Sequence, residues 1–497
     1  MGGSVAQGDP RTGAARPDPG PLDLLPSVVV GGILLALALA AYWLPGPVRF
    51  YNQFVWQAAA FLDGRAAIPW PVGGNYFFQD VLPLRDAHGA LTGYALLPFP
   101  PLPAIVLMPF VALFGLATDE RVVSVALGAL DVVICWWALG RLPVSRGVRL
   151  ATTVFFGFGS VAWYAASLGT TWYFAHVVAL APALLAVGVA LGGDRSFAAD
   201  AARVADRAED HETPPFGSRL AAAARAVAMD LWSLLRRPVS FLDRRQFVAG
   251  LLFGIACTAR LTIVLGAPFF VFVGSGGSMT RRAVSAGLGA AIPIGLLLAY
   301  NVATTGQLFH PGYEYLYQLE ARGYRALGYN PAWKIEDIRY LPQNLGIMLT
   351  SLPAILPNTM PGLAGGQPLC TEPGAVRGLF DVACPIAMPR DIGMSILLTS
   401  PAYLLAIPAL RRLRSSRLVA GGTLAIVAIA VVNLMHFSQG WVQFGYRFSN
   451  DFVAFALPLV AIGMARRGGV TRLAVVLLAA SVAVNFWGMT WGNLLGW

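Results

Sequence analysis

The sequence predicts an all-α protein that crosses a lipid bilayer many times. Hydrophobic residues make up 57% of its 497 residues and charged residues only 12%, which is far from the composition of soluble domains. Apolar runs of about 18–20 residues recur along the chain, and each is long enough to span the hydrocarbon core as a helix. No series of segments shows the alternation of apolar and polar residues that a transmembrane β-barrel requires.

The positive charge predicts which helix ends face the cytoplasm. Nearly all of it is arginine, since Lys334 is the only lysine, and the formal net charge is +10. The arginines gather at helix ends instead of forming one patch. This distribution argues against a nucleic-acid partner and makes the arginines markers of the cytoplasmic side.

The first outer loop decides the topology. Residues 1–23 are rich in Gly, Pro and Asp and are expected to form a disordered cytoplasmic N-terminus, followed by a retained first span at Leu24–Leu44. Pro98–Leu116 is apolar enough for a second span, but counting it as one places the most basic loop outside. Its five prolines favour a juxtamembrane helix within an outer loop, Pro45–Glu120.

With that helix at the membrane surface, the charge count predicts eleven spans, with the N-terminus inside and the C-terminus outside. The ten later spans are expected at Arg121–Leu139, Leu150–Ala166, Phe174–Leu191, Phe247–Thr258, Leu261–Gly274, Ala283–Ala303, Gly393–Leu410, Leu418–Leu434, Asp451–Met464 and Leu473–Gly492.

Two long segments divide the membrane module. Residues 24–191, with the outer loop at 45–120, form its first part, residues 247–303 its second, and residues 393–497 the C-terminal helices. Between them lie a cytoplasmic insertion, 192–246, and a large extracytoplasmic loop, 304–392, after the seventh span. The insertion holds nine arginines and is expected to be helical around Arg219–Leu235.

A carboxylate stands among aromatic and amide side chains in the first outer loop, at the end of NYFFQD. The simplest interpretation of Asp80 is a solvated turn residue. Alternatively, it is a catalytic base that takes the proton of an acceptor hydroxyl, with Asn75 and Gln79 as neighbours that bind substrate. For Asp63 and Asp86 in the same loop, a helix-end role and a polar turn are expected.

Arg260 interrupts the apolar stretch ACTARLTIV between the fifth and sixth spans. An arginine stranded at membrane depth costs a few kcal/mol, so it needs an anionic partner or water. One possibility is an ion pair with a protein carboxylate. The other is the phosphate of a lipid-linked donor, whose oxygens a guanidinium can bind in a bidentate manner.

The last outer loop, GWVQFGYRFSND, places Arg447 beside aromatic and amide side chains. Its aromatic residues can simply belong to the interfacial belt. Arg447 is interpreted as a second contact to a phosphate or pyrophosphate, and Tyr446 as a substrate contact.

Further polar residues lie where the same outer region is expected. His310, Tyr313 and Glu314 follow the seventh span and suit stacking on, and hydrogen bonding to, a sugar. His176 lies near the outer end of another span. Ordinary loop packing and structural hydrogen bonding explain these residues equally well.

The four cysteines and the absence of nucleotide motifs narrow the chemistry. Cys370 and Cys384 share the large outer loop, where a disulfide is plausible, whereas Cys135 and Cys257 lie in apolar helices. The sequence has no P-loop, no dinucleotide-binding glycine motif, no serine nucleophile elbow and no Cys/His metal spacing. ATP-driven transport and serine-hydrolase chemistry lose support accordingly.

Several of these segments together resemble the polytopic glycosyltransferases of the GT-C superfamily, in particular the bacterial branch related to protein O-mannosyltransferases and aminoarabinose transferases. The matching segments are FFQD with PFPPLPAIVLMPF, ACTARLTIV, AYN…TGQLFHPGYEY, MSILLTSPAYLL and GWVQFGYRFSND. The resemblance implies a GT-C fold and inverting transfer from a polyprenyl-phosphate sugar on the outer leaflet. It makes Asp80 the base and Arg260 the donor-phosphate contact, with Arg447 a weaker match.

The chain departs from this pattern at two positions. Many relatives carry a second acidic residue where this chain has Tyr94–Pro98, and another where it has Thr170–Tyr173 and His176. Both departures weaken the case for a carboxylate-bound metal. We therefore expect an enzyme that needs no metal and no cofactor.

The expected function is transfer of a sugar to a hydroxyl of a glycan, glycolipid or protein, at the periplasmic or exterior face of a bacterial inner (plasma) membrane. One alternative is a flippase or transporter for a lipid-linked sugar, which needs polar residues inside several spans; only Asp131 fits that requirement. Another is a polymerase or ligase of surface glycans, which uses a diphosphate leaving group. The sequence specifies neither the sugar nor the acceptor.

Overall fold

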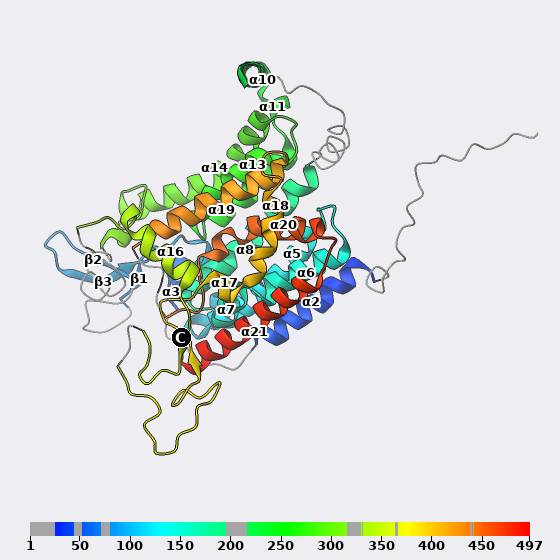
Figure 1. Ribbon diagram of the computed structural model, residues 1–497. Coiled ribbons are helices and arrows are strands. Elements are labelled where there is room, and N and C mark those ends of the chain that lie inside the picture. Colours follow the sequence, from blue (N-terminus) through cyan, green and yellow to red (C-terminus); the bar gives the residue numbers. More distant parts are fainter. Residues whose placement is uncertain are drawn as a thin grey trace, which may run out of the picture.

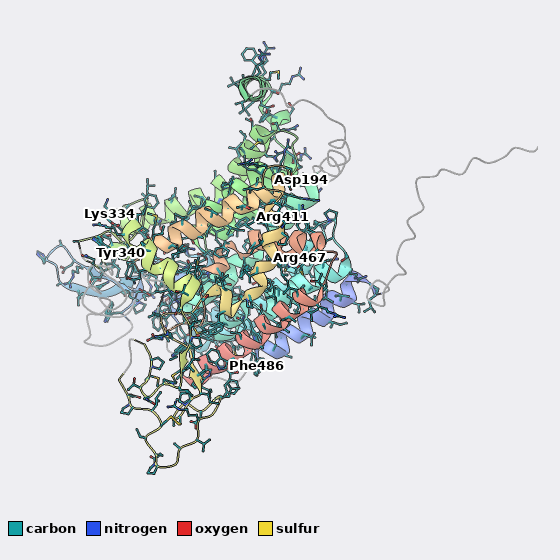
Figure 2. The ribbon with its side chains drawn as sticks, in the orientation of Figure 1. Asp194, Lys334, Tyr340, Arg411, Arg467 and Phe486 are labelled. Carbon is teal, nitrogen blue, oxygen red and sulfur yellow. A yellow bond between two sulfur atoms is a disulfide. The ribbon has the colours of Figure 1, made fainter. Side chains whose placement is uncertain are left out.

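The protein is described by a computed structural model over residues 25–43, 52–70, 80–194, 216–315, 330, 332–362, 366–437, 440 and 442–497. Most of these residues are helical, and the helices pack side by side into a bundle (Figure 1). Arg411 and Arg467 lie at one end of the bundle with Asp194, whereas Lys334 and Tyr340 lie at the other (Figure 2). The predicted fold class, a mainly helical protein with apolar helices, agrees with this architecture.

The N-terminal half of the bundle surrounds one apolar helix, α5. Its members are α2 (Ser27–Tyr42), α5 (Glu120–Leu139), α6 (Arg146–Phe158), α7 (Val161–Leu168) and α8 (Thr171–Gly193). Helix α5 contacts the other four. Helices α6 and α7 follow one another with a bend of 46°.

The C-terminal half contains several short or broken elements. They are α12 (Arg244–Cys257), η2 (Leu261–Gly266), α13 (Ala267–Phe272), α14 (Met279–Thr305), α17 (Ile396–Thr399), η5 (Pro401–Ala406), α18 (Ile407–Leu410), α19 (Arg417–Met435), α20 (Ser449–Arg466) and α21 (Arg472–Leu494). Helices α13, α14 and α19 lie together on one side of the bundle, α2 and α21 lie on the other, and α8 and α20 lie between (Figure 1).

Glycines allow a close contact between α12 and α14. A Cβ atom at Gly250 would lie 2.0 Å from the carbonyl oxygen of Ala286, and one at Gly289 would lie 2.1 Å from that of Phe247. No larger residue fits at either position without moving a backbone. Small residues at helix contacts are typical of membrane proteins, where close backbone approach supplies much of the packing energy.

The first outer loop contains a small sheet that sequence analysis did not predict. The elements of this loop are α3 (Gln53–Leu62), β1 (Ile68–Pro69), β2 (Leu82–Arg85), β3 (Leu91–Leu96), α4 (Leu102–Phe114), which forms where the juxtamembrane helix is predicted, and η1 (Gly115–Ala117). The strands pair antiparallel in the order β1-β3-β2. Strands this short carry too few residues for alternation to reveal them. Asp86 forms the expected turn, where its carboxylate accepts hydrogen bonds of 2.9 Å from the N–H groups of His88 and Ala90.

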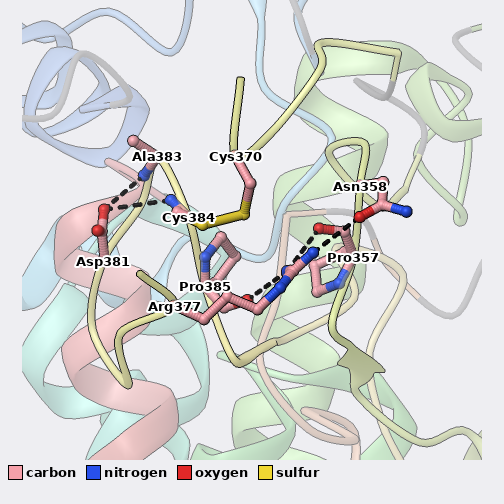
Figure 3. The surroundings of a disulfide bond; sticks show 8 residues. All are labelled: Pro357, Asn358, Cys370, Arg377, Asp381, Ala383, Cys384 and Pro385. Atoms are coloured by element: carbon pink, nitrogen blue, oxygen red, sulfur yellow. Dashed lines mark hydrogen bonds between the residues drawn. A yellow bond between two sulfur atoms is a disulfide. The ribbon is translucent and has the colours of Figure 1, made fainter. Parts of the chain in front are cut away.

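The large outer loop is held by polar contacts more than by an apolar core. Its elements are η4 (Ile338–Tyr340), α16 (Leu341–Thr350) and the paired strands β4 (Ala354–Ile355) and β5 (Ala387–Met388). A disulfide joins Cys370 to Cys384 (Figure 3). Beside it, Arg377 donates hydrogen bonds to the carbonyl oxygens of Pro357 (3.0 Å) and Pro385 (2.9 Å).

Five described helices are long and apolar enough to cross a membrane: α5, α8, α14, α19 and α21; counting α6 and α7 as one bent span gives six. The other expected spans coincide with elements that are shorter or broken, namely α2, α12, η2–α13, α17–η5–α18 and α20. The count of eleven spans and the orientation therefore remain predictions. In the insertion, α10 (Phe216–Arg236) and α11 (Pro238–Phe241) cover the segment predicted to be helical.

We expect the disulfide to govern the order of the large outer loop and not that of the bundle. Replacing Cys370 and Cys384 with serine removes a covalent link across a sequence separation of 14 residues. A cross-link of that span restricts the unfolded loop by about 3 kcal/mol, so the opened fraction should rise by roughly a hundredfold. Limited proteolysis should then cleave between residues 366 and 390 much faster, while the thermal transition of the helices stays unchanged. Equal cleavage of the native and serine variants would contradict this expectation.

Candidate active site

Asp80 lies where the first outer loop meets the N-terminal end of α8. Its backbone is left-handed, with φ of +58°, a conformation that Asp adopts more readily than most residues. The indole N–H of Trp172, in the first turn of α8, donates a hydrogen bond to the Asp80 carboxylate. Burial raises the pKa of the Asp80 carboxyl above its ordinary value, while the Trp172 hydrogen bond and the charges of Arg447 and His436 oppose that rise. Asn75 and Gln79 lie outside the described residues.

A tight turn positions Trp172. Helix α7 ends at Gly169, whose φ of +57° is left-handed, and α8 begins two residues later. A Cβ atom at Gly169 would lie 2.7 Å from the Cα atom of Arg121. Only glycine permits both the left-handed turn and the close approach to α5 at this position. This turn places the first turn of α8 next to Asp80.

Arg260 makes a bidentate ion pair with Asp451. It occupies the break between α12 and η2, and Asp451 lies in the first turn of α20. Nη2 of Arg260 is 3.0 Å from Oδ2 of Asp451, and Nε is 3.2 Å from Oδ1. The Asp451 side chain is fully buried, whereas that of Arg260 remains 20% exposed. Of the two possibilities for Arg260, the structure contains the protein ion pair, and it leaves part of the guanidinium accessible.

Three more groups surround the Asp451 carboxylate. The Thr262 hydroxyl donates to Oδ2 at 2.7 Å and the Asn433 amide at 3.1 Å, while Nδ1 of His176 lies 2.9 Å from Oδ1. Sequence analysis did not single out Asp451 as a site residue. The sequence feature that could have identified Asp451 is its place at the start of an apolar helix, four positions after Arg447.

Arg447 lies beside the same group with a different set of contacts. Its guanidinium carbon is 5.1 Å from the centre of the Phe448 ring and 5.9 Å from that of Tyr173. Arg260 also lies over Phe448, at 5.6 Å, so one aromatic ring contacts both cations. Burial lowers the pKa of Arg447, and the nearby Arg260 acts in the same direction. Within the described part of the chain, no carboxylate lies at ion-pair distance from Arg447.

Glycine and aromatic groups fix the position of Arg447. A Cβ atom at Gly440 would lie 2.8 Å from its guanidinium carbon, so the guanidinium packs directly on the backbone there. The Tyr173 hydroxyl donates a 2.9 Å hydrogen bond to the carbonyl oxygen of Val442 in the same loop. The loop therefore holds Arg447 against α8 and α20.

The other predicted substrate contacts fall into two groups. Tyr313 is 39% exposed, and its hydroxyl lies within electrostatic range of Asp80, Arg260 and Arg447. Glu314 beside it is exposed. His310 accepts a hydrogen bond of 3.0 Å from the N–H of Gly312, and burial lowers the pKa of His310 to about 4.

His176 and Tyr446, by contrast, are interior residues. Each is only 1% exposed. His176 contacts Asp451, and the ring of Tyr446 packs edge-on against Phe448 at 6.0 Å. Their contacts in this structure are with the protein, and both support residues that carry the site's charges.

The large outer loop joins the site through a contact between the side chains of His436 and Glu336. Nδ1 of His436 lies 3.3 Å from Oε1 of Glu336, and the two residues also form a backbone bridge. Two backbone hydrogen bonds extend this bridge. The N–H of Asp337 donates to the carbonyl oxygen of Met435 at 2.8 Å, and the N–H of Phe437 donates to that of Ile335 at 2.9 Å. His436 is one of the positive groups that act on Asp80.

The site therefore gathers residues from four separate segments, and we call Asp80, Arg260, Arg447, Asp451 and Tyr313 the polar cluster. It combines one carboxylate of raised pKa, one neutralised guanidinium and one guanidinium without a carboxylate partner in the described chain. Among the described residues, no group of three or more His, Cys, Asp or Glu side chains is placed to hold a metal ion.

We expect the loss of Arg260 alone to destabilise the protein more than the loss of Arg260 and Asp451 together. Arg260→Gln leaves the buried Asp451 carboxylate without its cation, which should lower the free energy of unfolding by about 3 kcal/mol. Replacing both residues together, as Arg260→Met with Asp451→Leu, removes the uncompensated charge and should restore most of that loss. Thermal unfolding of the two variants in detergent measures the difference. A double variant as unstable as the single one would exclude this coupling.

Comparison with known proteins gives little further information. No protein-family model matches the sequence, and no curated protein matches it. Among solved structures, the chain is similar to the crystal structure of the Archaeoglobus fulgidus oligosaccharyltransferase in the apo form, with a TM-score of 0.38 and 10% sequence identity. The alignment covers 93% of this chain and 56% of that one, so the chain spans about half of the archaeal protein's length.

Proposed function

We propose that this chain is a membrane glycosyltransferase of the GT-C type, which moves a sugar from a polyprenyl-phosphate donor to a hydroxyl acceptor at the outer face of a bacterial membrane. One observation supports this proposal above the others. A carboxylate of raised pKa lies beside a guanidinium that has no carboxylate partner in the described chain. A base next to an anion-binding cation is what this transfer requires.

In the proposed reaction, the acceptor hydroxyl attacks the anomeric carbon from the side opposite the phosphate. The new C–O bond forms as the bond to the phosphate oxygen breaks, and its electron pair leaves with the lipid phosphate. Asp80 takes the hydroxyl proton. The configuration at the anomeric carbon is inverted, and no covalent enzyme intermediate is involved.

The two arginines have different parts in this proposal. Arg447 supplies the main positive charge for the departing phosphate, because no carboxylate in the described part of the chain lies at ion-pair distance from it. Arg260 is already paired through Nε and Nη2, so only the accessible remainder of its guanidinium can reach a ligand. It contributes one directed hydrogen bond, and Asp451 fixes its direction.

Tyr313 and Glu314 are proposed to contact the sugar or the acceptor. Tyr313 belongs to the polar cluster and is exposed, and Glu314 beside it is exposed as well. His310 has a lowered pKa and is therefore expected to act as a neutral hydrogen-bonding group. The sugar and the acceptor are not specified by these contacts. A glycan, a glycolipid or a protein hydroxyl would satisfy the same chemistry.

A flippase for the lipid-linked sugar is the second candidate, and Asp131 is the observation that favours it. This carboxyl is 1% exposed within α5, and neither oxygen has a hydrogen-bond partner in the described part of the chain. Movement of a labelled donor between leaflets without any change in its glycosidic linkage would support that function. A surface-glycan polymerase or ligase would instead require a diphosphate-linked donor.

Asp80→Asn should abolish transfer without destabilising the protein. The amide oxygen can still accept the Trp172 hydrogen bond, but it cannot take a proton, so the rate should fall by about a hundredfold or more. Burial raises the pKa of Asp80, so ionising this carboxyl costs stability at pH values above the usual aspartate pKa, and the uncharged variant should be at least as stable as the native protein.

The measurement is transfer from a labelled polyprenyl-phosphate sugar in proteoliposomes, with thermal unfolding in parallel. Asp86→Asn is the matched control, because Asp86 lies in the same loop but only forms a turn. Undiminished transfer by a folded Asp80→Asn variant would exclude Asp80 as the base.

The pH dependence should follow the charge of Asp80. A general base works when ionised, so transfer should fall as pH drops through a pKa above the usual range of aspartate. Arg447 opposes this raised value, so Arg447→Gln should raise the pKa further and move the acidic limb to higher pH. Profiles of rate against pH for both proteins measure the shift. An acidic limb at the same pH in both proteins would show that the charge of Arg447 does not affect the pKa of Asp80.

A further inference from the structure

Helix α10 (Phe216–Arg236) carries large apolar side chains that no other described element covers. Met229 is 67% exposed, Trp232 57% and Leu235 77%. The helix belongs to the arginine-rich insertion, which the proposed transfer reaction does not use. Exposed tryptophan and methionine on one helix indicate a binding surface and not an ordinary solvated face.

The exposed side chains follow a helical stripe. Arg225, Met229, Trp232 and Arg236 are spaced at i, i+4, i+7 and i+11, which places them on one face. The guanidinium carbon of Arg236 lies 4.4 Å from the centre of the Trp232 ring. We call these four residues the α10 stripe.

The α10 stripe faces away from the rest of the protein. Asp230 and Leu234, one helical turn apart, are only partly exposed, whereas the residues of the stripe are exposed. Helix α10 contacts α14 and α11. The contact side of the helix is therefore the side that carries Asp230 and Leu234, and the stripe lies on the other side.

The orientation of α10 differs from that of the long helices. Figure 1 shows α10 nearly end-on, beyond α11 and outside the bundle, whereas α14 and α19 are seen from the side. A helix that lies across the direction of the long apolar helices, close to where α14 and α12 begin, lies along the membrane surface. This is the position of an interfacial amphipathic helix.

The charges around α10 are complementary to an anionic surface. Arg225, Arg236 and Arg237 are exposed, and exposed Arg244 and Arg245 follow at the start of α12. Within α10 and the described segment that leads from it to α12, the acidic residues are Asp230, which is on the contact side, and Asp243, which caps α12. Arginine next to tryptophan suits the boundary between headgroups and acyl chains, because both side chains combine an apolar body with a polar end.

We infer that α10 is a membrane-surface helix whose stripe binds the headgroups of anionic lipids through Arg225 and Arg236 and inserts Met229 and Trp232 among the acyl chains. This inference is independent of the proposed transfer activity. It assigns the insertion a binding site for anionic phospholipid on the side of the membrane where the arginines gather.

The test uses the full chain in lipid nanodiscs with a fluorescent label at position 229. The native cysteines do not interfere, because Cys135 and Cys257 are buried and Cys370 is bonded to Cys384. The Met229→Cys variant is labelled and compared with Val227→Cys, which lies on the side of Asp230 and is nevertheless 45% exposed. Nitroxide-labelled lipid quenches from the bilayer and iodide quenches from water, in discs with and without phosphatidylglycerol.

In discs that contain phosphatidylglycerol, the label at 229 should be quenched by the lipid and protected from iodide, and the label at 227 should show the reverse. Arg225→Glu with Arg236→Glu should release the helix, since each arginine near an anionic surface changes the bound-to-free ratio roughly fivefold. Iodide access at 229 in both kinds of disc would overturn the inference. Equal protection in both kinds would overturn the role of anionic headgroups, because the contact would then not depend on lipid charge.

Discussion

The buried carboxylate of Asp451 is the constraint on which the arrangement of the outer end depends. A fully buried charge is tolerated only when its oxygens are paired and hydrogen-bonded. Here the partners come from α8, from the break after α12 and from α19, while Asp451 itself belongs to α20. These four segments must therefore reach one point. The requirement explains why the apolar stretch around Arg260 forms two short elements and not one long helix.

The same constraint separates the roles of the two arginines on Phe448. Two guanidinium groups over one ring would repel each other if both kept their full charge. Asp451 neutralises one of them, and the aromatic face stabilises both. The remaining positive charge is concentrated at Arg447, next to Asp80. In this way the Arg260–Asp451 pair sets the electrostatics around Arg447 and Asp80, which are proposed to bind the phosphate and to take the proton.

The helices could be predicted from the sequence because apolar runs depend only on local composition. The ends of α5, α8, α14 and α19 lie within a few residues of the expected spans. The site was partly predictable, since Asp80, Arg260 and Arg447 are polar residues in places where polar residues are rare. Asp451 was not identified, because its importance comes from Thr262, Asn433 and His176, which are distant in sequence. The strands of the first outer loop were missed because pairs such as β1 and β3 are defined by contact and not by pattern.

The wide separation of the cluster along the chain has a consequence for biosynthesis. Asp80 is made early, in the first outer loop, whereas Arg447 and Asp451 are made just before the last helix, α21. Until those late residues are made, Arg260 and His176 lack Asp451, the carboxylate that they contact in the structure, and the segments around it cannot take their final positions. Contacts between residues this far apart form late in folding, because long loops must close first. A chain that stops before Arg447 would hold the earlier helices but no assembled polar cluster, so the cluster can form only after α20 has been made.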